Sequence, residues 1–79
     1  MKLWIGNIAP GTQEDEIRDL VARYGIESVG VIEQVPGDGT RPAVMVDVTT
    51  TTEQMMRTTQ RLNGLFWKGR SLNVQNMTR

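Results

Sequence analysis

The chain of 79 residues contains no cysteine and no histidine. Without cysteine there are no disulfides, thiolate metal sites, iron–sulfur clusters or thiol nucleophiles. Without histidine the commonest general base and the commonest transition-metal ligand are missing. The sequence also has no Gly-x-Ser-x-Gly motif, no phosphate-binding loop and no dense pair of carboxylates. We therefore expect a protein that is not an enzyme and that carries no metal or cofactor.

Net charge and long apolar segments are lacking as well. Lys plus Arg is 9 and Asp plus Glu is 9, so bulk positive charge does not drive binding to a polyanion. No apolar run approaches the roughly 18 residues that a membrane span requires. Gly6, Asn7 and Pro10 interrupt any apolar core of a signal peptide. These absences predict a cytoplasmic protein with no membrane partner.

The charges that are present are distributed unevenly along the chain. Residues 1–39 contain three bases and seven acids, a net charge of −4, whereas residues 40–79 contain six bases and two acids, a net charge of +4. Either the two segments pack side by side and partly neutralise each other, or the second half forms a basic face.

The length and the hydrophobic content set the size of the core. Hydrophobic residues make up 38% of the chain and charged residues 23%, which is ordinary for a globular domain. At this length about 60% of the surface of the unfolded chain is buried on folding, enough for a single two-layer core. We therefore expect one domain over residues 1–79.

Apolar side chains alternate in four segments and recur at helical spacing in two others. The predicted strands are residues 2–8, 26–35, 43–48 and 71–75, and the predicted helices are residues 12–25 and 52–62. Thr12 and Thr52 are the expected N-caps, because a threonine hydroxyl accepts from free backbone N–H groups of the first helical turn. Gly25 and the pair Asn63-Gly64 are expected to end the helices.

The resulting βαββαβ order predicts the fold class. It is an α+β, ferredoxin-like sandwich, in which a four-stranded antiparallel sheet has two helices on one face. The other face of the sheet is left open. On a small domain an open face is usually a binding surface or an oligomer interface.

The residues expected on this open face alternate with the apolar core residues of each strand. They are Trp4, Gly6, Ser28, Gly30, Ile32, Ala43, Met45, Asp47, Asn73 and Gln75, whereas Val31 is expected in the core. A tryptophan on an open face exposes a large apolar area. Either a loop or the C-terminal tail covers Trp4, or its indole is a stacking platform for a base or for a side chain of a partner.

Three stretches of the chain carry a resemblance to a known family. Residues 3–8 are Leu-Trp-Ile-Gly-Asn-Ile, residues 12–25 form the first predicted helix, and residues 62–64 and 67–70 are Leu-Asn-Gly and Trp-Lys-Gly-Arg. They resemble, respectively, the RNP hexamer, the first helix and the approach to the last strand of the RNA recognition motif family. Trp4 matches the aromatic position of the hexamer. The resemblance covers nearly the whole chain and implies the strand order 4-1-3-2.

The second motif of that family, the RNP octamer, departs from its pattern K/R-G-F/Y-G/A-F-V-x-F/Y. The matching residues 41–48 are Arg-Pro-Ala-Val-Met-Val-Asp-Val, so Arg41 keeps the basic position and both outward aromatic positions are lost, to Ala43 and Met45. Stacking is worth about 1–3 kcal/mol per base, so the loss of two platforms predicts binding weaker by roughly 2–6 kcal/mol. Asp47, if it lies on the same face, would repel phosphate.

The resemblance implies that single-stranded RNA is the partner and that it binds with modest affinity on the open face around Trp4. The residues expected to contact RNA are Lys2, Trp4, Arg41, Ala43, Met45, Asn73 and Gln75. A base would stack on the Trp4 indole while Arg41 holds an adjacent phosphate. The alternative is that RNA binding is lost and that the same face mediates a protein–protein interaction or self-association into a homodimer.

Overall fold

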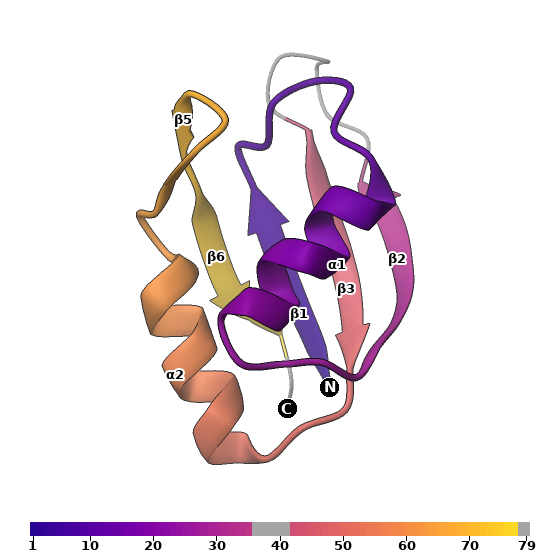
Figure 1. The fold of residues 1–79 in the computed structure, drawn as a ribbon, viewed down its shortest axis with the longest axis vertical. Coiled ribbons are helices and arrows are strands. Elements are labelled where there is room, and N and C mark those ends of the chain that lie inside the picture. Colours follow the sequence, from indigo (N-terminus) through magenta and orange to yellow (C-terminus); the bar gives the residue numbers. More distant parts are fainter. Residues whose placement is uncertain (36–41, 78–79) are drawn as a thin grey trace.

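A computed structural model describes residues 1–35 and 42–77 of the chain (Figure 1). Its elements are, in chain order, β1 (Lys2–Gly6), α1 (Glu14–Arg23), β2 (Val29–Val35), β3 (Ala43–Val48), α2 (Thr52–Leu62), β4 (Phe66–Trp67), β5 (Arg70–Ser71) and β6 (Asn73–Asn76). The predicted βαββαβ order is confirmed, with β6 as the predicted last strand. The sequence did not predict the short strands β4 and β5, which pair with each other between α2 and β6.

The main sheet is antiparallel and has the order β2-β3-β1-β6. This is the order that the family resemblance implied, because β6 is the last strand of the βαββαβ series. In Figure 1, α1 crosses in front of β1 and β3, and α2 lies beside β6 on the same side of the sheet. The α+β, ferredoxin-like class is therefore confirmed, and one face of the sheet is left without helices.

The core lies between the sheet and the two helices. Its strand residues alternate with the residues of the open face, and its helix residues follow the helical spacing seen in the sequence. They include Leu3, Ile5, Val44, Val46, Val48, Val74, Ile17, Leu20, Val21, Met55 and Leu62, all at most 3% exposed.

Strand β2 differs from the prediction beyond Val29, where its two faces are exchanged. Ile32 is only 7% exposed and belongs to the core, whereas Val31, which was expected there, is 63% exposed. The register explains the exchange: Val29 lies opposite Val48 and Ile32 opposite Val46, so three steps along β2 match two along β3. Such a β-bulge reverses the alternation of side chains beyond it.

The guanidinium group of Arg18 holds the bulge in place from α1. It donates hydrogen bonds to the carbonyl oxygens of Val29 and Gly30, at 2.7 and 2.9 Å. These contacts give hydrogen-bond donors to two backbone carbonyls at a point where the pairing of β2 with β3 is irregular. The bulge therefore depends on a side chain from another element.

The N-cap of each helix lies one residue away from the predicted one. The N-cap of α1 is Gln13, whose backbone N–H donates to the Glu16 carboxylate at 3.1 Å, while the Thr12 hydroxyl donates instead to the Ala9 carbonyl at 2.6 Å. The N-cap of α2 is Thr51, whose hydroxyl accepts from the Gln54 N–H at 3.1 Å. In each case a neighbouring polar residue takes the capping position.

A buried threonine links the two helices. Thr58 is fully buried, and its hydroxyl donates to the Tyr24 carbonyl at the end of α1, at 2.8 Å. The same hydroxyl accepts from the Gln54 amide at 3.0 Å. In the part of the chain that the structure describes, no buried side-chain nitrogen or oxygen lacks a hydrogen-bond partner.

Candidate nucleic-acid interface

Trp4 lies on the open face of the sheet. It stands on β1, which pairs with β3 on one side and β6 on the other, and it is opposite Met45 and Gln75. Leu3 and Ile5, its neighbours in the sequence, are fully buried on the helix side. Alternation along the strand therefore directs the half-buried indole to the open face.

The indole rests on the backbone of Gly6. A Cβ at Gly6 would collide with the six-membered ring of Trp4, and Cζ2 and Cζ3 of that ring would each lie only 2.8 Å from it. The ring therefore occupies the space that the side chain of any other residue at this position would need. One side of the indole is supported by the strand, which leaves the opposite side for stacking.

A hollow of about 450 Å³ borders the indole at the end of β1. Trp4, Asn7, Ser71 and Asn73 line it. The pairing of Gly6 with Asn73 brings the end of β1 against β6, and Ser71 precedes β6 on the adjoining hairpin. The hollow therefore combines one aromatic ring with uncharged polar groups that can donate to or accept from a base edge.

Hydrogen bonds made by Asn7 and Arg70 fix the rim of the hollow. Asn7 has a left-handed backbone with φ of 59°. Its side-chain Nδ2 donates to the Ser71 carbonyl at 2.9 Å. Arg70 Nη1 lies 3.5 Å from Asn7 Oδ1 and donates to the Ile8 carbonyl at 3.3 Å. These bonds join the β4–β5 hairpin to the end of β1.

The other half of the open face, over β2 and β3, is acidic. Glu33 lies opposite Met45, and Asp47 lies opposite Lys2. The Lys2 ammonium is 3.9 Å from the Glu33 carboxylate. Both carboxylates remain largely exposed, with side chains 63% and 53% accessible for Glu33 and Asp47. Asp47 therefore lies on the open face, with its carboxylate 3.7 Å from the N-terminal ammonium.

The structure brings together only part of the residue set expected from the sequence. Trp4, Met45 and Gln75 form one cross-strand row, and Asn73 lies beside it at the hollow. Lys2 is on the same face but is paired with Glu33. Ala43, expected on the exposed surface, is only 5% exposed and offers little area to a ligand. Arg41 lies outside the described residues.

Ile32 is a further correction, because it was expected to flank Trp4 on the open face and lies in the core instead. Its place on the cross-strand row is taken by Glu33, which is opposite Met45. An apolar neighbour of the indole is thereby replaced by an acid. The bulge in β2 is the cause.

Sequence reasoning missed two residues that line the hollow, Asn7 and Ser71. Asn7 follows β1, and asparagine is one of the few residues that adopt a left-handed backbone readily. That signal was available in the sequence. The role of Ser71 depends on a hairpin that brings it against β1, which no local pattern predicts.

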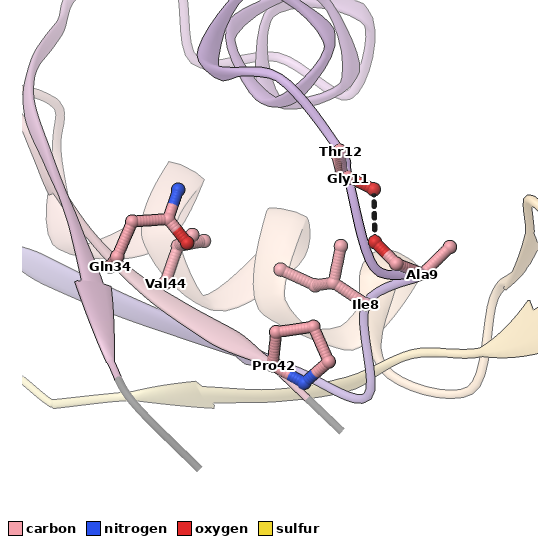
Figure 2. A pocket seen from close by; sticks show the side chains of 7 residues that line it. All are labelled: Ile8, Ala9, Gly11, Thr12, Gln34, Pro42 and Val44. Atoms are coloured by element: carbon pink, nitrogen blue, oxygen red, sulfur yellow. Dashed lines mark hydrogen bonds between the residues drawn. The ribbon is translucent and has the colours of Figure 1, made fainter. Parts of the chain in front are cut away.

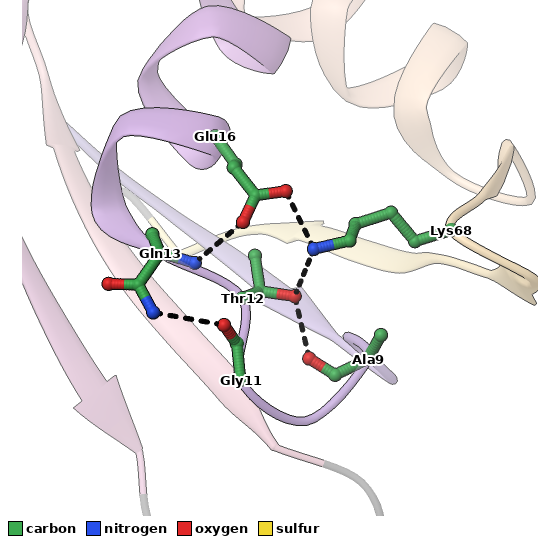
Figure 3. A network of polar contacts seen from close by, with 6 residues as sticks. All are labelled: Ala9, Gly11, Thr12, Gln13, Glu16 and Lys68. Atoms are coloured by element: carbon green, nitrogen blue, oxygen red, sulfur yellow. Dashed lines mark hydrogen bonds and ion pairs between the residues drawn. The ribbon is translucent and has the colours of Figure 1, made fainter.

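A network of polar contacts attaches the hairpin to the start of α1 (Figure 3). Lys68, in the turn between β4 and β5, donates to the Glu16 carboxylate at 2.6 Å and lies 3.4 Å from the Thr12 hydroxyl. The hydrogen bond from Lys68, with a second from the Gln13 N–H, holds the pKa of Glu16 below its ordinary value of 4.5. The hairpin is therefore held from two sides, by Glu16 and by Asn7.

Two other hollows are present in the described part of the chain. The one under the β1–α1 connection, lined by Ile8, Ala9, Gly11, Thr12, Gln34, Pro42 and Val44, measures about 30 Å³ (Figure 2). That is room for about one water molecule and not for a ligand. The second lies between α1 and the half-buried Trp67, which packs against the core.

Residues 1–35 and 42–77 contain no group of three or more Asp, Glu, His or Cys side chains arranged to hold a metal ion. No helix in the same ranges is both long enough and apolar enough to span a membrane.

Comparison with known proteins gives matches among solved structures alone. No protein-family model matches the chain, and none of the curated proteins matches it in sequence. Pes4 RRM3 has a TM-score of 0.80 with 17% identity, over 99% of this chain and 92% of that chain. The Rna15 RRM with bound RNA (GU) has a TM-score of 0.76 with 18% identity, over 99% of this chain and 83% of that chain.

A third similar structure contains the three N-terminal RNA binding domains of the yeast splicing factor Prp24. Its TM-score is 0.79 and its identity 26%, over 99% of this chain but only 33% of that chain. The match therefore spans one domain-sized part of the larger structure.

Proposed function

We propose that this chain, which has the fold of RNA recognition motif domains, is a module that binds single-stranded RNA with modest affinity and has no catalytic activity. The observation that carries the proposal is the Trp4 indole, which rests on Gly6 in the open face beside a polar hollow. Such a ring offers a stacking surface for one base. Solved structures with this fold include one with bound RNA, that of the Rna15 RRM.

The contacts expected around a stacked base are mostly uncharged. Asn73 and Gln75 are exposed on β6, and Gln75 is the cross-strand partner of Trp4. Their amide groups can read base edges, and we expect the amide of Asn7, at the rim of the hollow, to contact the base or the ribose 2′-hydroxyl. We assign phosphate contacts to basic residues such as Arg41.

The modest affinity follows from the same surface. A single aromatic ring, worth about 1–3 kcal/mol, replaces the three that the family pattern provides. Glu33 and Asp47 add negative charge over β2 and β3. With about three phosphate contacts the logarithm of the binding constant should fall with the logarithm of salt concentration with a slope near −2.

The test is a titration of the protein with a pool of short, labelled single-stranded RNAs, followed by fluorescence anisotropy. Trp4→Ala should lower the affinity by about 1–3 kcal/mol. Met56→Ala is the matched control, because Met56 is 53% exposed on α2, on the helix side of the molecule. It should leave the affinity unchanged.

Two outcomes would contradict the proposal. If the RNA pool does not bind, or binds with no dependence on salt, the open face does not recognise a polyanion. If Trp4→Ala leaves binding unchanged but converts a dimer into a monomer in a sedimentation measurement, the face mediates self-association instead.

A further inference from the structure

The two halves of the open face differ in charge. Strands β2 and β3 contain Glu33 and Asp47 and no basic residue. Residues 63–77, which contain β4, β5 and β6, include Lys68 and Arg70 and no acidic residue. Ion pairs reduce this difference, because Lys2 lies 3.9 Å from Glu33, the N-terminal ammonium 3.7 Å from Asp47, and the Lys68 ammonium 2.6 Å from Glu16. The side chains of Glu33 and Asp47 still remain 63% and 53% exposed, so the surface over β2 and β3 is the less favourable one for a polyanion. The charges therefore favour a path for RNA over β1, β6 and the hairpin.

The hairpin places a second aromatic residue on that half. The turn residues Lys68 and Gly69 both have positive φ, 51° and 82°, as in the type I′ turns of tight hairpins. Phe66 is the cross-strand partner of Ser71, and such partners project from the same face of a pair. Ser71 lines the hollow beside Trp4. Phe66 is therefore expected to project from the same side of the hairpin as Ser71, one strand beyond this lining residue.

Phe66 is 72% exposed, the most exposed of the large hydrophobic residues in the described part of the chain. Trp67 lies on the opposite face of the hairpin and packs against the core, so packing accounts for an aromatic residue at position 67. Packing does not explain Phe66. Because Lys68 and Asn7 anchor the hairpin, the ring is carried on a supported element.

The distance between the two aromatic residues favours two separate bases. Between Gly6, beneath the indole, and Phe66 lie two strand spacings of about 4.8 Å across the strands and two residue steps of about 3.3 Å along them, which combine at right angles to about 12 Å. A base held between two rings needs only about 7–8 Å. The polar side chains of Ser71 and Asn73 lie in the interval.

We propose that single-stranded RNA crosses this domain over β1, β6 and the β4–β5 hairpin, with one base on Trp4 and a second base on Phe66. This inference rests on the proposed function and names the path of the ligand across the site. It differs from the expectation drawn from the sequence, which placed contacts on Ala43 and Met45 of β3. Phe66 takes over part of the stacking that β3 no longer provides.

The experiment compares variants at the two edges of the open face. Phe66→Ala should weaken binding of a labelled pool of random RNA hexanucleotides by about 5- to 150-fold, the value of one stacked base. Phe66→Tyr should retain the affinity, because the aromatic ring remains. Val31→Ala is the matched control, since Val31 is an apolar side chain 63% exposed on β2 at the acidic edge. It should bind as the unmodified protein does.

Amide NMR spectra of the unmodified protein should show shifts at Ser71 and Asn73 on addition of RNA, and none at Glu33. RNA binding that Phe66→Ala leaves unchanged while Trp4→Ala weakens it would overturn the path and leave the proposed function standing. Shifts confined to β2 and β3 would do the same. If Phe66→Ala instead dissociates a dimer and leaves the RNA affinity unchanged, the proposed path is also overturned. Failure of the unmodified protein to bind RNA would overturn both proposals.

Discussion

Replacing Gly6 by alanine tests the contact that supports the stacking surface. The added Cβ occupies space taken by the Trp4 ring, so the indole has to swing away from the strand. Overpacking costs about 1–3 kcal/mol, and alanine is preferred to glycine within a strand by roughly 0.5–1 kcal/mol. Because the half-buried indole can rotate, we expect a net loss of unfolding free energy of about 1 kcal/mol. RNA affinity should fall by about 1–3 kcal/mol, the value of one stacked base.

The control is the same substitution in a protein without the indole. In the Trp4→Ala background the collision is absent, so Gly6→Ala should raise the free energy of unfolding by about 0.5–1 kcal/mol and leave the remaining RNA affinity unchanged. Urea denaturation and fluorescence anisotropy on the four proteins of this cycle measure both effects. If Gly6→Ala destabilises both backgrounds equally, the glycine is required by the backbone, and the reasoning about the indole is refuted.

Two further predictions concern the contacts that hold the fold around the site. Because Lys68 lowers the pKa of Glu16, this ion pair stabilises the protein above pH 4.5, and the stabilisation is lost as the pH falls through the lowered pKa. In Lys68→Met the Glu16 pKa, measured by carboxyl NMR, should return towards 4.5, and a pKa that stays low would contradict the assignment. Thr58→Val leaves the Tyr24 carbonyl without its buried donor and should cost about 1–3 kcal/mol in urea denaturation. Thr58→Ser keeps the hydroxyl and should cost less, and an equal loss would point to packing instead.

The core was predictable because it rests on periods that the sequence repeats, whereas the strand order was implied by the resemblance to the RNA recognition motif family. Leu3 and Ile5 alternate with Trp4, and Val44, Val46 and Val48 alternate with their neighbours in the same way. The amphipathic spacing of Ile17 and Leu20 marks the buried face of α1 in the same manner. A residue that stands on the buried face of a regular element is placed by its spacing alone. The placement of Trp4 on the open face followed directly.

The reversal in β2 was not predictable from alternation, because a bulge inserts one residue into the count. Its position depends on Arg18, which lies on α1 and reaches the carbonyls of Val29 and Gly30. That contact joins residues 11 and 12 positions apart and leaves no periodic trace in the sequence. The prediction therefore assigned Val31 and Ile32 to the wrong faces.

The hairpin was missed for a related reason. Strands β4 and β5 have two residues each, too few to show a period. The Lys-Gly pair at 68–69 is a weak turn signal by itself. What fixes the hairpin is its contact with Glu16 and Asn7, distant in the sequence. The hollow between Trp4 and Ser71 exists only once those contacts are made. The sequence therefore predicted the Trp4 indole at the centre of the candidate site, but not the hollow beside it.

The zero net charge of the chain and the charges around the site lead to different expectations for RNA binding. Summed over the sequence the charges cancel, which disfavours attraction from a distance. Around the site they form local pairs: Glu33 with Lys2 at 3.9 Å, Asp47 with the N-terminal ammonium at 3.7 Å, and Lys68 on the hairpin with Glu16 at 2.6 Å. At about 0.15 M salt the screening length is about 8 Å, so a bound strand responds mainly to the nearest charges. The exposure and pairing of these nearby charges, and not the total, therefore determine where a polyanion can lie on this face.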